Sequence, residues 1–403
     1  MKVLCFVDAP HRLAGAQRSL LAALSGLPAE GVTPRVVFPA EGRCVDAYRA
    51  AGVDCVVLPA PAALLEFGKA HLRAGKLAQA RVLVTACVPY ARALARLARA
   101  WGADLLHFNT PRGILAAGLA ARLVQRPTVL HLRGAVPFGG PLWFAAQALA
   151  DRIVLVAHAL EPEVARPFRR RTRVVYNGVT IPELSTHANA RTDARAALTA
   201  TFGVPREGAL FVALSSPVPF KGLHHLLDAA CRARDAGLDA HYLLAGSSDD
   251  ARYTDWLTRR RDTLGLGSAV TFAGFVGEPA TLLAGADALV LPSIEREQLD
   301  LDGTTIDVRG NEGLPRSVLE AMAHRLPVIA SRLAGAVEEV EEGESGLLVP
   351  PGDPRALAEA LLTLARDASF RTRAGARGRE LAETRFSVGA SARGLAAVFR
   401  ELH

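Results

Sequence analysis

Short apolar runs of strand length alternate with helix-length segments along almost the whole chain. In the first half the apolar runs are Val3–Val7, Arg35–Phe38, Cys55–Leu58, Leu105–Phe108, Thr128–Leu132, Ile153–Val156 and Val174–Tyr176. In the second half they are Leu210–Leu214, Tyr242–Ala245, Val270–Ala273, Ala288–Leu291, Pro327–Ala330 and Gly346–Val349. Strands that alternate with helices are typical of a parallel sheet covered by helices on both faces. The pattern therefore predicts an α/β fold.

A polar segment, Ser185–Arg195, separates the two series of strands. Because 403 residues exceed what one hydrophobic core normally serves, we predict two Rossmann-like domains facing across a cleft, at residues 1–180 and 190–385. Residues 386–403 are predicted to form a C-terminal helix, and the sequence leaves open whether it packs on the first domain. Parallel α/β sheets bind ligands beyond the carboxyl ends of their strands, so a site shared by both domains would lie in the cleft.

Positive charge is concentrated in the first half of the chain. Residues 1–180 carry 23 Lys and Arg against 10 acids, whereas residues 181–403 carry 24 against 30. Two clusters stand out: Lys69, Arg73, Lys76, Arg81, Arg92, Arg96 and Arg99, which have no acid among them, and Arg166, Arg169, Arg170, Arg171 and Arg173. Two interpretations stay open, a solvated helix surface or a face for an anionic membrane or lipid-linked substrate. Nucleic acid is not expected, because no recognition motif accompanies the charge.

The cysteines and the apolar runs bear on the compartment. The five cysteines (Cys5, Cys44, Cys55, Cys87 and Cys231) form no C-x-x-C pair, so we expect free thiols in a reducing compartment. The first apolar run is too short for a secretory signal, and no uncharged run has the character of a membrane span. We expect a cytoplasmic protein, either soluble or attached peripherally at the inner face of the membrane.

The segment Glu312–Ala323 places two carboxylates, Glu312 and Glu320, eight residues apart across a predicted helix start. Pro315 fits the first helical position, so the N–H groups of residues 316–318 would point out of the helix, where an anionic phosphate is favoured. Ionised carboxylates bind paired hydroxyl groups well, because each oxygen accepts two hydrogen bonds. This layout fits a diphosphate that carries a sugar on one side and a ribose on the other.

Other candidate positions follow predicted strands. Lys221 stands at a helix start, where the helix dipole disfavours a cation; this favours a role on an anion such as a diphosphate over an exposed surface lysine. The small residues of Ala14–Gln17 would allow close approach of a phosphate, although any strand-to-helix turn needs small residues. His131 ends a strand, where a structural role and a catalytic role both stay open. Arg133 could hold phosphate or pair with an acid.

The polar segment Ile294–Asn311 is rich in acidic residues, which is one feature of a metal site. It has no histidine or aromatic support and no defined ligand spacing. We therefore interpret it as a mobile flap or solvated loop rather than as a metal site.

These features together resemble the GT-B-fold retaining glycosyltransferases of family 4, also called glycosyl transferases group 1. The segment from Glu312 to Ser331 is similar to that family's E-G-x-x-x-x-x-L-E-A-M-A-x-G-x-P-V-I-A-S core. Supporting matches are Lys221-Gly222, Asn177-Gly178-Val179, Gly335 before Glu338-Glu339, and Gly346–Pro350 followed by Gly352-Asp353. The resemblance covers most of the chain and is strongest over residues 205–365.

The resemblance implies a role for each matched position. Three are implied as catalytic: Glu312 at the hydroxyls of the donor sugar, Lys221 at the diphosphate and His131 near the anomeric carbon. Glu320 would bind the ribose diol. The other implied donor-binding positions are Gly15 and Ala16 in the first-domain loop, with Arg133, Ser216, Gly313, Leu314, Arg316, Ser317 and Val318. No metal ligand and no cofactor is expected, because the implied transfer is metal-independent and the nucleoside-diphosphate sugar is a substrate.

Two positions depart from the family pattern. Arg325 stands where the family core has a glycine, a change that matters little. The second departure concerns the diphosphate. Family members usually have an arginine five residues before the lysine that corresponds to Lys221, and this chain has Ser216 there. The diphosphate therefore loses a customary cation, for which Arg316, Arg133 or Arg18 could compensate.

The sequence thus predicts a retaining hexosyltransferase that moves a sugar from a nucleoside diphosphate to an acceptor hydroxyl. The acceptor would be a carbohydrate or a lipid-linked molecule, in bacterial surface polysaccharide or glycolipid synthesis. Two alternatives remain: a sugar-nucleotide epimerase or phosphorylase on the same fold, and a non-catalytic nucleotide-sugar-binding protein, which Ser216 brings into consideration. The pattern leaves the sugar, the base and the linkage open.

Overall fold

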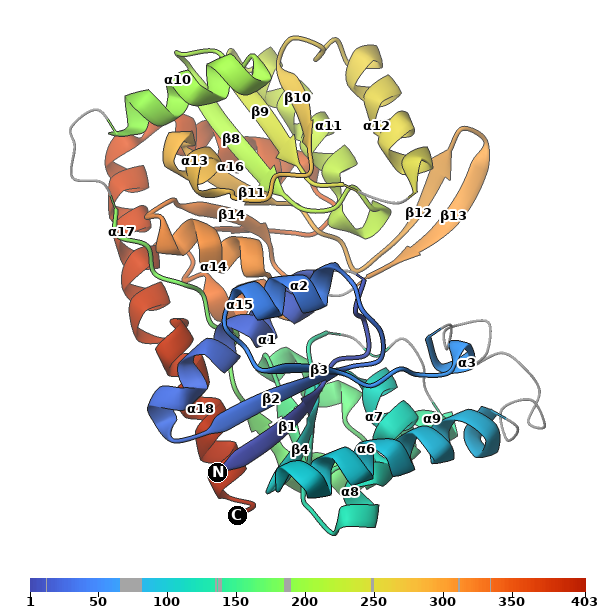
Figure 1. The fold of residues 1–403 in the computed structure, drawn as a ribbon. Coiled ribbons are helices and arrows are strands. Elements are labelled where there is room, and N and C mark those ends of the chain that lie inside the picture. Colours follow the sequence, from blue (N-terminus) through green and yellow to red (C-terminus); the bar gives the residue numbers. More distant parts are fainter. Residues whose placement is uncertain are drawn as a thin grey trace. The chain divides into compact units, whose positions relative to one another are not determined.

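The computed structural model describes residues 1–11, 13–65, 82–134, 136, 140–184, 190–247, 250–310, 312–333 and 335–403. In this part of the chain, residues group into two compact units, Met1–Val179 with Arg385–His403 and Thr180–Thr384. Each unit is built on a parallel sheet with helices, so the predicted α/β class is confirmed (Figure 1). The units divide at 179/180 and 384/385, whereas the predicted domains were residues 1–180 and 190–385 with a C-terminal helix over 386–403.

The first unit contains a seven-stranded parallel sheet. Its strands are β1 (Lys2–Phe6), β2 (Thr33–Phe38), β3 (Cys55–Val57), β4 (Leu105–Phe108), β5 (Thr128–Leu132), β6 (Arg152–Leu155) and β7 (Thr172–Val174). The order is β3-β2-β1-β4-β5-β6-β7, which is the Rossmann order with one further strand at the edge. In the register of β1, Cys5 lies between Val36 of β2 and His107 of β4.

The second unit repeats this arrangement with six parallel strands. They are β8 (Ala209–Leu214), β9 (Ala240–Ala245), β10 (Val270–Gly274), β11 (Ala288–Leu291), β14 (Val328–Ser331) and β15 (Gly346–Val349). The order is β10-β9-β8-β11-β14-β15. Strands β9 and β10 are therefore added on one side of β8, and the next three on its other side, with all six parallel. In such sheets the ligand-binding point lies where the strand order reverses, which here is between β8 and β11.

Helices connect the strands in both units. In the first unit they are α1 (Gly15–Gly26), α2 (Arg43–Ala50), α3 (Ala62–Leu65), α6 (Val88–Trp101), α7 (Pro111–Ala117), α8 (Leu119–Val124), α9 (Gly140–Leu149) and α18 (Val388–Arg400). In the second unit they are α10 (Ala190–Phe202), α11 (Leu223–Asp235), α12 (Ala251–Thr263), α13 (Ala280–Gly285), α14 (Arg316–Ala323), α15 (Ala336–Glu339), α16 (Pro354–Arg366) and α17 (Ala368–Thr384). The helix-length segment between β4 and β5 is divided into α7 and α8 at Gly118.

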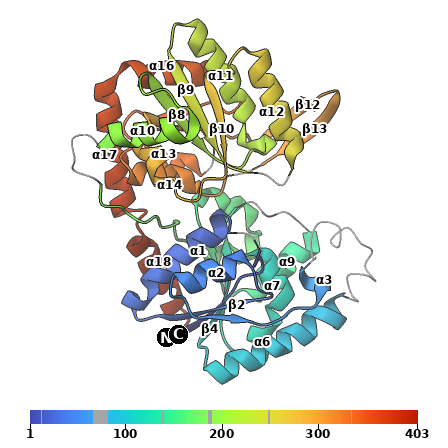
Figure 2. The same ribbon diagram turned by 45° about the horizontal axis from the view of Figure 1, so that its top comes forward.

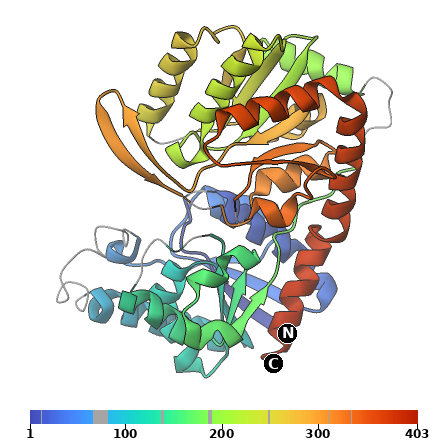
Figure 3. The same cartoon turned by 180° about the vertical axis from the view of Figure 1, so that it is seen from behind.

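The C-terminal helix α18 belongs to the first unit, where it packs against α1 (Figure 3). The helices approach closely at Gly26, since a Cβ placed there would lie 2.7 Å from the Cβ of Ala392. Just beyond the helix, Glu401 forms ion pairs with Arg152 and Arg173. The tertiary structure thus settles a packing question that the sequence left open.

The acidic segment after β11 is not the solvated loop that we predicted. It forms an antiparallel hairpin of β12 (Arg296–Leu301) and β13 (Thr304–Arg309), beside α12 (Figure 2). The turn residues Asp302 and Gly303 have φ of 54° and 80°, and left-handed conformations at both positions are what a two-residue hairpin turn requires. The Asp-Gly pair between runs of alternating polarity was the sequence signal for this hairpin.

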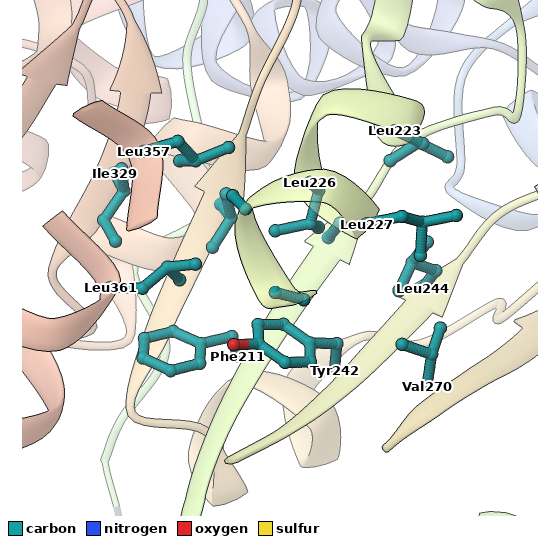
Figure 4. Packing of buried hydrophobic residues seen from close by; sticks show 14 of the residues in the cluster. Phe211, Leu223, Leu226, Leu227, Tyr242, Leu244, Val270, Ile329, Leu357 and Leu361 are labelled. Atoms are coloured by element: carbon teal, nitrogen blue, oxygen red, sulfur yellow. The ribbon is translucent and has the colours of Figure 1, made fainter. Parts of the chain in front are cut away.

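The hairpin is anchored by its apolar side chains. Leu299, Leu301 and Val308 are buried and belong to the core of the second unit. In that core, Leu226 and Leu227 of α11 pack over Phe211 and Tyr242, whose rings stack with centroids 5.6 Å apart (Figure 4). Because burial of large apolar side chains is the main source of folding free energy, the hairpin is a fixed part of this unit.

The basic helix of the first unit is observed in part. Arg92, Arg96 and Arg99 lie on the exposed face of α6, and Tyr90, Leu94 and Ala98 are buried. The predicted basic residues Lys69, Arg73, Lys76 and Arg81 fall outside the described residues. All five cysteines are free thiols.

Among the described residues, every helix is too short or too polar to cross a lipid bilayer.

Candidate functional site

Lys221 and Glu312 form an ion pair in the second unit. Lys221 Nζ lies 2.6 Å from Glu312 Oε1, and the Ser293 hydroxyl donates to the same oxygen at 2.6 Å. The side chains of Lys221 and Glu312 are 19% and 8% exposed. Lys221 follows β8 and Ser293 follows β11, so the pair lies at the carboxyl ends of the two strands where the sheet order reverses. The sequence proposed both residues for the donor site but did not predict that they pair.

Close backbone packing holds this pair in place. Gly222 has φ of 65°, and a Cβ there would lie 1.9 Å from the Pro292 carbonyl oxygen, so only glycine fits. The Ile294 N–H donates to the Phe220 carbonyl at 2.8 Å, and Phe220 fills the space that a Cβ on Gly310 would need. The chain before Lys221 and the two ends of the hairpin are therefore fixed to one another.

The start of α14 differs slightly from the prediction. The helix begins at Arg316, and Pro315 precedes it in an extended conformation. The Val318 N–H donates to the Pro315 carbonyl at 3.1 Å, so its predicted availability to a phosphate is wrong. Of the N–H groups predicted to bind a phosphate, those of Arg316 and Ser317 therefore remain as candidates.

The side chains around this helix start are graded in exposure. Glu312, Gly313 and Leu314 are buried, whereas Arg316, Ser317 and Glu320 are half-buried. Arg316 Nε donates to Glu320 Oε1 at 2.8 Å. Since the two groups are accessible and of opposite charge, each can exchange this contact for a ligand group.

Of the three arginines considered as substitutes for the one missing at Ser216, only Arg316 shares a unit with Lys221. Arg18 is half-buried in α1, in the first unit. Arg133, also in the first unit, donates to the side-chain oxygens of Asn109 at 3.0 Å and Asn177 at 2.7 Å.

His131 is buried at the end of β5 and meets a second histidine. Its Nδ1 lies 3.2 Å from Nε2 of His107 in β4. Burial and the nearby Arg133 guanidinium lower the pKa of His107 to about 3 and hold the pKa of His131 well below its usual range. Both rings are therefore neutral at pH 7. One of the two rings donates an N–H to the other, and the tautomers decide which.

Within the described residues, His131 Nε2 has no hydrogen-bond partner. The tautomer of the histidine pair decides whether Nε2 offers a ligand a donor or an acceptor. His107 was not among the site residues predicted from the sequence. Its position in a buried strand beside the strand of His131 was the available signal.

Gly15 opens α1 directly after the loop that follows β1. A Cβ on Gly15 would meet no described atom within 4 Å, so packing does not require glycine there. Ala16 is half-buried, and its carbonyl lies 3.5 Å from the Asn109 amide nitrogen. The open space at Gly15 is compatible with close approach of a ligand.

Glu339 is a charged group that was not predicted as a site residue from the sequence. It is 1% exposed at the end of α15, and neither carboxylate oxygen has a partner among the described residues. Burial raises the pKa of Glu339 well above its usual range, and the charges of Glu312 and Glu338 add to the effect. The sequence alone does not show which carboxylate of the Glu338-Glu339 pair is buried.

The histidine support that we found lacking for the acidic segment comes from α11. Glu297 of β12 contacts both His224 and His225, so the expectation that no histidine supports this segment is wrong. These three side chains are the group in the described part of the chain that could hold a metal ion. The sequence did not reveal this group, because Glu297 lies 72 residues after His225.

Both units match families of known proteins. Residues 13–181 match the family described as Glycosyltransferase Family 4, and residues 207–367 match Glycosyl transferases group 1. The lipopolysaccharide core biosynthesis glycosyltransferase LpsE of Rhizobium meliloti is 29% identical over 47% of this chain and 48% of its own length. The putative colanic acid biosynthesis glycosyltransferase WcaL of Escherichia coli is 32% identical over 35% of this chain and 32% of its own. The matched part of this chain thus spans about half the length of these relatives, or less.

The solved structures agree on the fold. Alr3699/HepE of Anabaena, in complex with UDP and glucose, superposes with a TM-score of 0.80 at 22% identity, and all of both chains is covered. This similarity shows the GT-B fold for the whole chain. With each unit matched by its own family and the fold shared throughout, the chain belongs to the GT-B glycosyltransferases of family 4 and group 1.

Proposed function

We propose that this protein is a retaining glycosyltransferase that moves a sugar from a nucleoside diphosphate to an acceptor hydroxyl. The observation that carries the proposal is the Lys221–Glu312 pair, which is held at the point where the second sheet reverses its order. The α14 start, with its half-buried Arg316 and Glu320, follows Glu312 directly in the sequence. Opposite charges and a helix start fit a ligand that has a diphosphate between two hydroxyl-bearing groups.

In the proposed reaction, the bond between the anomeric carbon and the diphosphate breaks while the acceptor oxygen bonds to the same face of the sugar. Negative charge then grows on the departing diphosphate. The ammonium group of Lys221 has three N–H donors, and only one is needed for Glu312. The others, with Arg316 and the helix start, would stabilise the leaving group electrostatically.

The acceptor hydroxyl must lose a proton in this step. A departing phosphate oxygen takes it, so no dedicated base is required and no metal takes part. Glu312 would hold the hydroxyls of the transferred sugar and Glu320 the ribose diol. The role proposed for His131, contact with the sugar near its anomeric carbon, is compatible with a neutral ring that presents Nε2.

The donor is proposed by analogy with the neighbours of this fold. HepE of Anabaena is described in complexes with UDP, UDP with glucose, and UDP-glucose. We therefore propose a UDP-sugar first and keep GDP-mannose as the second candidate. The names of LpsE and WcaL support an acceptor in surface polysaccharide or glycolipid synthesis, either a carbohydrate or a lipid-linked molecule.

A thermal-shift panel of nucleoside-diphosphate sugars tests donor binding. A ligand that binds only the folded state raises the midpoint, and at one hundred times its dissociation constant it adds about 2.7 kcal/mol to stability. We expect one UDP-sugar or GDP-mannose to give the largest shift, and UDP or GDP alone to give a smaller shift. If neither nucleotide nor any sugar nucleotide changes the midpoint, the proposed function is wrong.

We also propose that α6 lies against an anionic membrane surface. Its exposed Arg92, Arg96 and Arg99 have no acid among them, and each basic residue near such a surface contributes about 1 kcal/mol. We predict that the protein sediments with anionic vesicles but not with neutral vesicles. Changing the three arginines to glutamate should abolish this binding, as measured by co-sedimentation.

A matched variant controls for net charge. Arg355, Arg366 and Arg373 are exposed in the second unit, and changing these three to glutamate alters the charge by the same amount. We expect this variant to keep most of its vesicle binding. Equal losses in the two variants would show that overall charge, rather than α6, governs attachment.

A further inference from the structure

Three side chains that the proposed transfer does not use converge between α11 and the hairpin. Glu297 Oε2 lies 2.9 Å from His224 Nε2 and 3.1 Å from His225 Nε2. One donor atom from each residue lies within 4.8 Å of the other two. The two histidines are consecutive on α11, and both rings turn the same nitrogen toward one carboxylate oxygen.

The surroundings fix one ring and leave the other adaptable. His224 Nδ1 lies 2.7 Å from the Tyr253 hydroxyl, which orients the ring as outer contacts do for metal-bound histidines. His225 Nδ1 is buried and makes no hydrogen bond to any described residue, so its proton can move to this nitrogen and leave Nε2 free to bind. His224 and His225 have side chains 3% and 11% exposed, whereas Glu297 is 28% exposed and gives access from solvent.

The position of Glu297 on the hairpin is unusual. Alternate residues of a strand share a face, so Glu297 is on the same face as Leu299 and Leu301, which are buried in the core. A carboxylate on this face must be compensated, and the two histidines supply the observed contacts. The side chain is thus held against α11 by a polar cluster at one end of an apolar stripe.

We propose that His224, His225 and Glu297 form a binding site for a first-row transition-metal dication, with Zn²⁺ the best fit. Two imidazole nitrogens and one carboxylate oxygen are ligands that zinc takes in three-ligand sites, with a fourth position for water. Tetrahedral ligands about 2.1 Å from zinc lie about 3.4 Å apart. The two carboxylate–histidine separations, 2.9 and 3.1 Å, would open slightly, and the two histidine nitrogens, which lie within 4.8 Å of each other, would take up the same spacing. Mg²⁺ and Ca²⁺ prefer all-oxygen sites and do not fit.

A metal here would fasten the hairpin to α11. The same two segments also carry the proposed donor site, since Lys221 precedes α11 and Glu312 follows the hairpin. The metal would therefore stiffen the connection to that site without touching a reacting atom. This inference does not depend on the transferase function, because metal binding is measured without a donor.

The test uses the full chain and Zn²⁺ alone. After equilibrium dialysis, we expect the wild-type protein to retain one more zinc ion per chain than His225→Gln or Glu297→Gln, measured by elemental analysis. Zn²⁺ should raise the thermal midpoint of the wild type, slow hydrogen exchange in residues 296–309, and do neither in the two variants. Co²⁺ should give the absorption of a nitrogen and oxygen site without a thiolate charge-transfer band, which separates this site from the five cysteines.

His158→Gln is the matched control. His158 Nδ1 lies 2.8 Å from Glu161 Oε1, and this exposed histidine–glutamate pair of the first unit belongs to no group of three metal-ligating side chains among the described residues. We expect this variant to retain as much zinc as the wild type. Circular dichroism without metal confirms that each variant folds. Equal zinc retention in the wild type, His225→Gln and Glu297→Gln would overturn the proposal, as would a response to Mg²⁺ as strong as that to Zn²⁺.

Discussion

Replacing Lys221 with alanine should lower kcat by about 10²–10³-fold, the usual cost of losing one group that stabilises a developing negative charge. The donor KM should change far less. Lys221 is proposed to act on charge that grows only as the diphosphate departs, so its loss raises the transition state more than the bound ground state. Steady-state kinetics with the donor identified by thermal shift measures both constants.

The structure adds a second consequence of this substitution. Glu312 Oε1 would keep only the Ser293 hydroxyl as a partner among the described residues, at a position 8% exposed. We expect a loss of stability of about 1–3 kcal/mol, as for a buried polar group that loses its partner. Activity must therefore be measured well below the thermal midpoint of the variant.

Arg377→Ala is the control for Lys221→Ala, because it removes a basic partner of a carboxylate away from the proposed donor site. Arg377 of α17 pairs with Glu341 in the same unit, and both side chains are about one-third exposed. This variant should lose little stability and keep its kcat. If Lys221→Ala loses activity only through a higher donor KM, or if Arg377→Ala loses kcat equally, Lys221 does not stabilise the leaving group.

Replacing Glu339 with methionine should stabilise the protein, and the gain should increase with pH. The folded state holds the Glu339 proton more tightly than the unfolded state, because burial and the charges of Glu312 and Glu338 raise the folded pKa. As pH rises above the unfolded value of 4.5, the unfolded state loses this proton first, so wild-type stability falls. The loss is about 1.4 kcal/mol for each pH unit until the folded pKa is passed.

Methionine has a similar length and no charge, so the variant lacks this loss. The measurement is urea unfolding of both proteins from pH 5 to pH 8, with the difference between them plotted against pH. The buried His107 and His131 contribute with the opposite sign, since their folded pKa values are lowered, but they cancel in the difference.

Glu359→Met is the control, because this carboxylate is 65% exposed on α16. Its stability relative to the wild type should change little with pH. A Glu339→Met difference that is flat, or that shrinks as pH rises, would show that the buried carboxyl is already ionised in the folded protein.

Local patterns accounted for most of the fold. All thirteen apolar runs predicted as strands lie in or next to observed parallel strands, since runs buried on both faces differ clearly from amphipathic helices. The hairpin β12–β13 was missed because its acidic, outward residues dominated its composition. Its Asp302-Gly303 turn and alternating leucines carried the correct signal.

The candidate site was only partly visible from sequence. Glu312, Lys221 and Arg316 were identified from their positions around helix starts, which are local features. The availability of the Val318 N–H was wrong, because the turn from Pro315 uses it. A shift of one residue in where a helix begins changes which amide groups remain for a ligand.

By itself the sequence determined the order of the parallel strands along the chain, the two-domain organisation and the family, because apolar periodicity and short motifs are local properties of the chain. Only the tertiary structure decided which charges meet. Lys221 pairs with Glu312 across 91 residues, and His225 meets Glu297 across 72. The burial of Glu339, which has no hydrogen-bond partner among the described residues, likewise depends on what packs around it. Such contacts form because the sheet and its connections bring distant segments together. The pattern of residues along the chain does not show which distant side chains will be neighbours in space.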